Sequence, residues 1–185
     1  MRILLTNDDG INAPGFAVLE AIAATLSDDV WVCAPADEHS GAGHSLTLSR
    51  PVRVRELGPK RFAVSGTPTD CILMALGELM DARPDVILSG VNRGANLGDD
   101  TLYSGTVAAA LEARFLGKTG IAVSLVGAHA HGYGIDAYRP AAAMVARLIE
   151  GWHRLRLPHR TILNVNVPDM PLADPAGAGF APDAF

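Results

Sequence analysis

The chain has 185 residues, of which 49% are hydrophobic and 19% are charged, and its formal net charge is −5 at pH 7. This length suits one α/β domain with its own core and is short for two domains. The acidic balance disfavours binding to duplex nucleic acid or to an anionic membrane. No apolar run is long enough to span a bilayer, and the pair Asp8-Asp9 comes too early for a signal peptide, so we expect a cytoplasmic protein. Cys33 and Cys71 are predicted to be buried, reduced thiols.

Predicted strands and helices alternate along the chain. Residues 2–6 predict a strand, residues 14–26 predict a helix with Pro14 in its first turn, and residues 30–34 are typical of a strand buried on both faces. The later elements predicted in chain order are strands at 52–57 and 61–64 that form a hairpin, a helix at 68–80, a strand at 85–89, a helix that begins at Ser104 or Thr106 and ends at 115, a strand at 121–126, a helix at 137–149 and a strand at 161–167.

This alternation predicts an α/β fold with a doubly wound, mainly parallel sheet flanked by helices and a small β-hairpin extension. Residues 1–168 form one domain in this interpretation. Residues 169–185 lack periodicity and are predicted to be an irregular C-terminal tail.

The run Asn7-Asp8-Asp9-Gly10 follows the first predicted strand directly. Neighbouring side chains of an extended strand point to opposite faces, so both carboxylates reach one ion only if the backbone turns, and Gly10 permits such a turn. Open α/β sheets bind ligands at the carboxyl ends of their strands. The pair therefore indicates a divalent-ion site, and a solvated Asp-Gly turn is the alternative interpretation.

Polar residues also follow two further predicted strands. Residues 37–40, which include Glu38 and Ser40, follow the second strand, and Asn92, Arg93 and Asn96 follow the strand at 85–89. In a parallel sheet these loops emerge along one edge and converge with Asp8 and Asp9. Carboxylate, hydroxyl and carboxamide oxygens suit Mg²⁺, Mn²⁺ or Ca²⁺ better than Zn²⁺. His39 and His44 border this predicted site as candidate substrate contacts or proton carriers.

Tyr103-Ser104-Gly105-Thr106 stands where a helix is predicted to begin. Free backbone N–H groups and the helix dipole favour a phosphate there, and an ordinary Ser/Thr cap is the alternative. The glycine-rich stretch at 90–98 has no Walker lysine, and no Gly-x-Gly-x-x-Gly follows the first strand, so P-loop ATP binding and a dinucleotide fold are unsupported. No Gly-x-Ser-x-Gly motif indicates a covalent nucleophile.

Several sequence blocks together resemble one known family. They are ILLTNDDGINAPG at 3–15, Ala34-Pro35 with Ser40-Gly41, GTPTDC at 66–71, PDVILSGVNRGANLG at 84–98, YSGTV at 103–107 and NVNVP at 164–168. In this order, and over residues 1 to 168, the chain resembles the SurE (survival protein E) family of metal-dependent 5′/3′-nucleotidases. Such a series is much more specific than any single glycine motif.

The resemblance implies a Rossmann-like sheet, one divalent ion per subunit, Mg²⁺ or Mn²⁺ as that ion, and a homodimer or homotetramer. It implies that nucleoside 5′- and 3′-monophosphates are substrates, and short polyphosphate a further one. The implied metal ligands are Asp8, Asp9, Ser40 and Asn92, and the implied phosphate-binding residues are Gly41, Asn96, Ser104, Gly105 and Thr106. Asp8, Asp9 and Asn96 are the hypothesised catalytic residues, with one aspartate orienting or deprotonating the attacking water and Asn96 stabilising the phosphoryl oxygens.

The chain departs from the family pattern after residue 168. Family members continue for several dozen residues with a hairpin that exchanges between subunits, so we expect this chain to be truncated or its tail to be non-contiguous. Two alternative functions make different demands on the site. A haloacid-dehalogenase-type phosphatase needs an Asp-x-Asp pair, which the adjacent Asp8-Asp9 does not supply. A nucleotide or phosphate sensor without turnover needs only the residues that bind its ligand.

Overall fold

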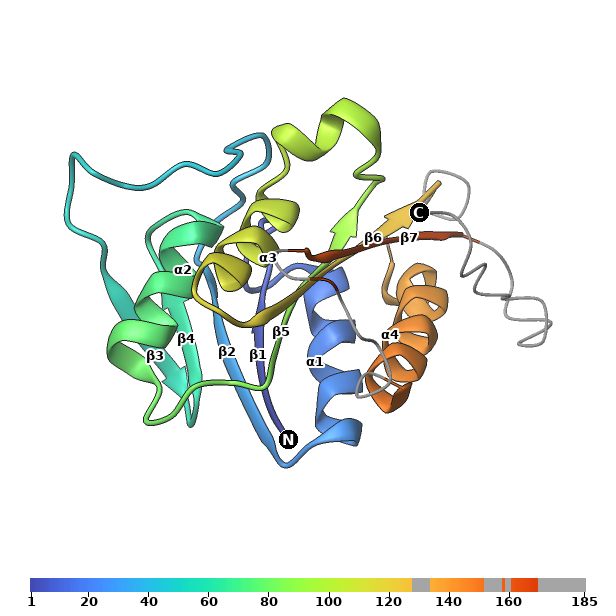
Figure 1. Ribbon diagram of the computed structural model, residues 1–185, viewed down its shortest axis with the longest axis horizontal. Helices are drawn as coiled ribbons and strands as arrows, with labels where there is room; N and C mark the ends of the chain where they lie inside the picture. The colour runs from blue at the N-terminus through green and yellow to red at the C-terminus, as the bar shows by residue number, and fades with distance from the viewer. Residues whose placement is uncertain (128–133, 152–157, 159–160, 170–185) are drawn as a thin grey trace.

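One sheet of seven strands organises the described part of the chain (Figure 1). The computed structural model describes residues 1–127, 134–151, 158 and 161–169. The strands are β1 (Arg2–Thr6), β2 (Asp29–Pro35), β3 (Val54–Gly58), β4 (Arg61–Val64), β5 (Val86–Arg93), β6 (Thr119–Val126) and β7 (Leu163–Pro168). Their spatial order is β3-β4-β2-β1-β5-β6-β7, and each neighbouring pair is parallel except β3 with β4. The predicted α/β class with a mainly parallel sheet is confirmed.

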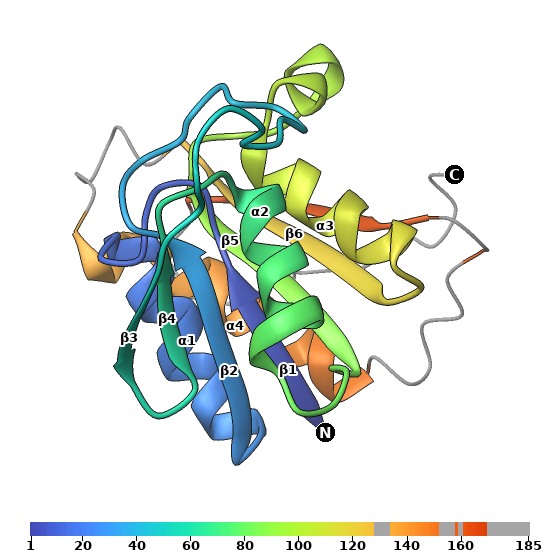
Figure 2. The same cartoon turned by 90° about the vertical axis from the view of Figure 1, so that its left-hand side faces the viewer.

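Helices cover both faces of this sheet (Figure 2). The helices α1 (Pro14–Leu26) and α4 (Arg139–Gly151) pack on one face, and α2 (Pro68–Met74) and α3 (Gly105–Phe115) pack on the other. The side chains of β1 divide between the two faces because successive residues of a strand point in opposite directions. Ile3 and Leu5 belong to the α1/α4 core, and Leu4 belongs to the α2/α3 core.

Most predicted elements are present in the structure, and four of them differ in pairing or extent. The hairpin β3–β4 is joined to the main sheet, because β4 pairs with β2. The helix predicted at 68–80 is α-helical only to Met74 and continues as a π-helical turn, η1 (Ala75–Leu79). The helix predicted at 137–149 begins with a 3₁₀ turn, η4 (Ile135–Tyr138), before α4.

The strand predicted to end at residue 89 continues to Arg93 in β5. Its pairing with β6 is irregular between Ser89 and Asn92. A Cβ atom on Gly90 would lie 2.3 Å from the carbonyl oxygen of Val123, so only glycine allows β5 to pass β6 at this distance. Beyond the irregularity Asn92 pairs with Ser124, so β6 holds this candidate ligand in the sheet.

The described helices include none that is both long and apolar enough to cross a membrane. Cys33 and Cys71 are buried and free, as predicted, and the Cys33 thiol donates to the carbonyl oxygen of Cys71 at 3.2 Å. The predicted tail lies outside the described residues from residue 170 onward. The carboxyl ends of the parallel strands lie along one edge of the sheet, at the top of Figure 1. This edge carries the candidate site.

Candidate metal and phosphate site

The turn after β1 presents two neighbouring carboxylates at this edge. Gly10 has a φ of +96°, a conformation that favours glycine, so the predicted turn is confirmed. The side-chain amide of Asn7 donates to the carbonyl oxygen of Gly10 at 2.7 Å and braces the turn. Asn7 is 1% exposed, and its amide oxygen has no hydrogen-bond partner among the described residues. Asn7 is a supporting residue to which the sequence interpretation gave no role.

Asp8 lies against the N-terminus of α3. Its side chain is buried, at 4% exposure, and accepts a hydrogen bond from the hydroxyl of Thr106. Burial raises the pKa of Asp8, and hydrogen bonds from the Thr106 side chain and from backbone groups of Thr106 and Gly105 oppose that rise. A Cβ atom on Gly105 would come within 2.8 Å of the Asp8 Cβ, so glycine allows this close approach. The helix N-terminus that was predicted to hold phosphate therefore also holds Asp8.

Asp9 points to the other side of the turn, toward the end of β5. One of its carboxylate oxygens, Oδ2, accepts a hydrogen bond from the backbone N–H of Arg93 at 3.0 Å. Burial, and next the negative charge of Asp8, raise the pKa of Asp9 to about 6. Two adjacent, mostly buried carboxylates disfavour each other's charge. A divalent cation would favour the charged form of both, so the pair fits a metal site.

Ser40 and Asn92 complete the predicted ligand set. The Ser40 hydroxyl donates to Glu38 Oε1 at 2.7 Å, and the Asn92 side-chain amide nitrogen donates to the carbonyl oxygen of Gly94 at 2.9 Å. The hydroxyl oxygen of Ser40, through its lone pairs, and the amide oxygen of Asn92 are the atoms left for a cation.

Hydrogen bonds tie the segments that carry these ligands to the turn after β1. His39, beside Ser40, donates its backbone N–H to the carbonyl oxygen of Asp8 at 2.8 Å. Arg93, beside Asn92, donates to Asp9. Within the described residues no three His, Cys, Asp or Glu side chains group as a metal cluster, so a cation here relies on hydroxyl and amide oxygens as well as the two carboxylates. Such an oxygen-rich set with few carboxylates is typical of Mg²⁺-like ions.

Asn96 is held by a network of polar residues. It is 6% exposed, and its side-chain amide donates to the Ser124 hydroxyl at 2.8 Å. Its backbone N–H donates to Asn166 Oδ1 at 2.8 Å, and its carbonyl oxygen accepts from Asn164 and from Asn166. The sequence interpretation missed the supporting role of these residues. The alternation Asn164-Val-Asn166 contains the signal, because residues two apart on a strand share one face.

The other predicted phosphate-binding residues differ in how the structure engages them. Ser104 caps α3 by accepting from the backbone N–H of Val107 at 3.1 Å, so the cap interpretation is confirmed. Gly41 has a φ of +75°, and a Cβ atom there would meet nothing within 4 Å. The requirement for glycine at this position is therefore conformational. His44, named as a candidate proton carrier, pairs with Glu112 at 2.8 Å and stacks on Phe115, both in α3.

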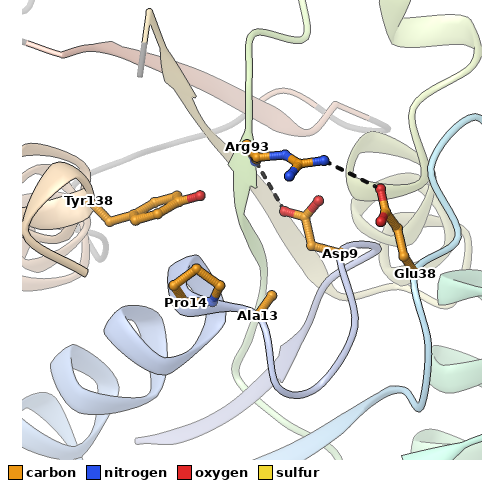
Figure 3. A pocket seen from close by; sticks show the side chains of 6 residues that line it. All are labelled: Asp9, Ala13, Pro14, Glu38, Arg93 and Tyr138. Carbon is orange, nitrogen blue, oxygen red and sulfur yellow. Dashed lines mark hydrogen bonds and ion pairs between the residues drawn. The ribbon is translucent and has the colours of Figure 1, made fainter. Parts of the chain in front are cut away.

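A cavity of about 150 Å³ lies beside Asp9 (Figure 3). Its lining residues are Asp9, Ala13, Pro14, Glu38, Arg93 and Tyr138. Figure 3 shows the Asp9 carboxylate between Arg93 and Glu38, with the Tyr138 hydroxyl directed toward the same space. The Arg93 guanidinium lies 3.7 Å from Glu38 Oε1. Tyr138 has no role in the sequence-based interpretation, and no local motif marks it.

The fold and the site together define a class of protein. This is a Rossmann-like α/β protein whose candidate site at the carboxyl edge places hard oxygen atoms of the kind that suit a cation beside a helix N-terminus of the kind that suits an anion. The profile of the family described as Survival protein SurE matches residues 3–182. The chain belongs to this family, as its sequence blocks indicated.

Individual relatives agree with this assignment. The protein described as 5′-nucleotidase SurE of Erythrobacter litoralis is 56% identical over 174 residues, which cover 92% of this chain and 68% of the relative. The one from Phenylobacterium zucineum is 52% identical over 175 residues, with 94% and 67% covered. The crystal structure of the SurE protein from Aquifex aeolicus superposes with a TM-score of 0.81 at 37% identity and covers 92% of this chain and 67% of that one. The chain thus spans about two thirds of the length of these relatives.

Proposed function

We propose that this chain is the catalytic part of a divalent-metal-dependent phosphomonoesterase that hydrolyses nucleoside 5′-monophosphates, and 3′-monophosphates as well, to nucleoside and phosphate. The observation that carries the proposal is the adjacent pair of the buried Asp8 and the partly buried Asp9, which contacts the N-terminus of α3 through Asp8. Metal ligands and phosphate donors then adjoin each other. The nucleotidase relatives support the same activity, and a sensor without turnover is not favoured.

Asp8, Asp9, Ser40 and Asn92 would hold the ion, for which we propose Mg²⁺ or Mn²⁺ with one ion per subunit. When bound, the ion supplies positive charge to the phosphoryl oxygens and activates the attacking water. Asp8 or Asp9 orients that water or accepts its proton as it attacks phosphorus. The Thr106 hydroxyl keeps Asp8 in place through the hydrogen bond described above.

Two further side chains are available to hold the phosphate. The Asn96 amide has two N–H groups and gives one of them to Ser124, which leaves the other for a phosphoryl oxygen. The Ser104 hydroxyl accepts from Val107 and still has its own proton to donate. Donors fixed in this way stabilise developing charge without reorganising during the reaction. Gly41, Gly105 and Thr106 remain proposed phosphate contacts.

Substrate range, assembly and location extend this proposal. Short polyphosphate would be a further substrate because it presents the same terminal phosphoryl group. We propose a homodimer or homotetramer in the cytoplasm and a single catalytic domain over residues 1–168.

Phosphate release tests the proposed function. Protein stripped with EDTA is assayed with 5′- and 3′-monophosphates and with short polyphosphate, before and after Mg²⁺ or Mn²⁺ is restored. We expect turnover only with metal, and at least a 100-fold loss in Asp8→Asn and Asp9→Asn. Asp28→Asn is the matched control, because this exposed aspartate precedes β2 at the opposite edge of the sheet. Near-normal rates in Asp8→Asn would refute the site, and ligand binding without turnover would support the sensor.

A further inference from the structure

Ser40 is the proposed ligand with the least support from regular structure. It is exposed, and it lies in residues 36–53, which contain no helix or strand. A serine hydroxyl rotates freely and has one proton and two lone pairs. A cation can use those lone pairs only when the proton points elsewhere, so the partner of that proton matters.

The Glu38 carboxylate accepts a hydrogen bond from the Ser40 hydroxyl. The Ser40 Oγ lies 2.7 Å from Glu38 Oε1. The same carboxylate oxygen lies 3.7 Å from Nη2 of Arg93, and the backbone N–H of Arg93 donates to Asp9. Glu38 lies in the same segment as Ser40 and brings that segment close to Arg93 at the end of β5, beside the Asp9 carboxylate (Figure 3). Through Arg93 its position is connected to one of the two acidic ligands.

We propose that Glu38 is a positioning residue for the metal site, which orients the Ser40 hydroxyl so that its lone pairs face the cation. The inference rests on the proposed function, because it requires Ser40 to be a ligand. Carboxylates that bind the hydrogens of metal ligands fix the orientation of those ligands and raise their basicity. The Arg93 guanidinium, 3.7 Å from the same Glu38 oxygen, attracts this carboxylate by its charge.

Glu38 is not itself a ligand in this interpretation. Asp8, Asp9 and Glu38 do not form a metal-binding group among the described residues, although all three are carboxylates. The Glu38 side chain is 53% exposed and directs one oxygen at both Ser40 and Arg93. Its effect on the ion therefore passes through Ser40.

Calorimetric titration of Mn²⁺ into EDTA-stripped protein tests whether Glu38 affects metal binding, without any assay of activity. We expect Glu38→Ala to raise the Kd for Mn²⁺ by about 10- to 100-fold, the usual effect of removing a residue that orients a ligand. Glu38→Gln keeps an acceptor oxygen for Ser40 and should recover part of that loss. Asp37→Ala is the matched control, since it removes an exposed carboxylate from the adjacent position and should change the Kd less than twofold.

The double variant Ser40→Ala/Glu38→Ala decides whether Glu38 acts on the ion through Ser40 or independently of it. If Glu38 acts through Ser40, the double variant binds Mn²⁺ as Ser40→Ala alone does, because the two effects share one pathway. If the double variant raises the Kd for Mn²⁺ by the product of the two single-variant factors, the inference is overturned. A rise in Kd in Asp37→Ala equal to that in Glu38→Ala would overturn it as well. An unchanged Kd in Ser40→Ala would overturn it too. In that case a loss of Mn²⁺ binding in Asp8→Asn would show that the acidic site itself still stands, so the two failures are distinguishable.

Discussion

Replacing Gly105 by alanine adds one methyl group at the contact between α3 and Asp8. The new Cβ would lie 2.8 Å from the Asp8 Cβ, 3.0 Å from its Oδ2 and 3.1 Å from Cγ of Pro68. The Asp8 Cβ is anchored directly to the backbone, so it cannot rotate away as the tip of a long side chain would. We expect either Asp8 or the first turn of α3 to shift by several tenths of an ångström.

Two energies of opposite sign determine the effect on stability. Crowding a packed site with an extra methyl group costs about 1–3 kcal/mol. Alanine in place of glycine in a helix returns at most about 1 kcal/mol, and less at the first helical position, where Gly105 lies. The free energy of unfolding should therefore fall by about 1–2 kcal/mol. The shift of Asp8 should weaken Mn²⁺ binding and phosphate release by at least tenfold, because small displacements of reacting groups have large effects on rate.

Gly77→Ala is the matched control. Gly77 lies in the helical turn η1, and a Cβ atom there would meet nothing within 4 Å, so the substitution should leave Mn²⁺ binding unchanged. Urea unfolding, Mn²⁺ titration and phosphate release are measured on both variants and on the wild type. If Gly105→Ala binds Mn²⁺ and turns over within twofold of the wild type, the argument that this contact positions Asp8 is refuted.

Three further predictions concern metal, pH and the long loop. Mn²⁺ at 100 times its Kd should stabilise the wild-type protein by about 2.7 kcal/mol and should not stabilise a variant that lacks an aspartate ligand, as thermal unfolding with and without EDTA would show. Lys60 and Arg2 hold the pKa of Asp29 below its usual range, so the stability that Asp29 contributes is present above its unfolded-state pKa, near 4, and is lost as the pH falls. The difference in unfolding free energy between wild type and Asp29→Asn should thus shrink from pH 7 to pH 3, and a constant difference would contradict the assignment. Thr67→Ala removes the cap of α2 and the hydrogen bond that Thr67 donates to the carbonyl oxygen of Ser45. The free energy of unfolding in urea should fall by about 1 kcal/mol, and proteolysis within residues 36–53 should become faster. An unchanged cleavage rate would show that Thr67 does not anchor this segment.

The sequence supported the fold prediction well because its signals are local. The apolar runs of β1 and β2 and Pro14 in the first turn of α1 each act within a few positions along the chain. The structure confirms the mainly parallel sheet that these signals predict. The end of β5 was predicted less well. Gly90 indicates a break by its residue type, but in the structure it lets β5 pass close to Val123 on β6, and the strand continues to Arg93.

The sequence by itself determined the residue types at the carboxyl edge of the sheet and the family to which the chain belongs. The loops that follow parallel strands lie at one edge of the sheet. The run after β1 supplies two adjacent carboxylates whatever the packing of the helices. The proposed ligands and phosphate contacts could therefore be named from their motifs. Their assignment to metal or phosphate remains a prediction.

Only the tertiary structure decided how these residues are engaged. Thr106 donates to Asp8 across 98 positions of sequence, and Arg93 donates to Asp9 across 84. Glu38 contacts both Ser40 and Arg93, whereas Tyr138 reaches the cavity beside Asp9 from a different part of the chain. Contacts of this kind depend on how helices pack on the sheet and on where the loops are tied down. No local pattern encodes them, because each side chain selects its partner from groups that only folding brings within hydrogen-bond distance.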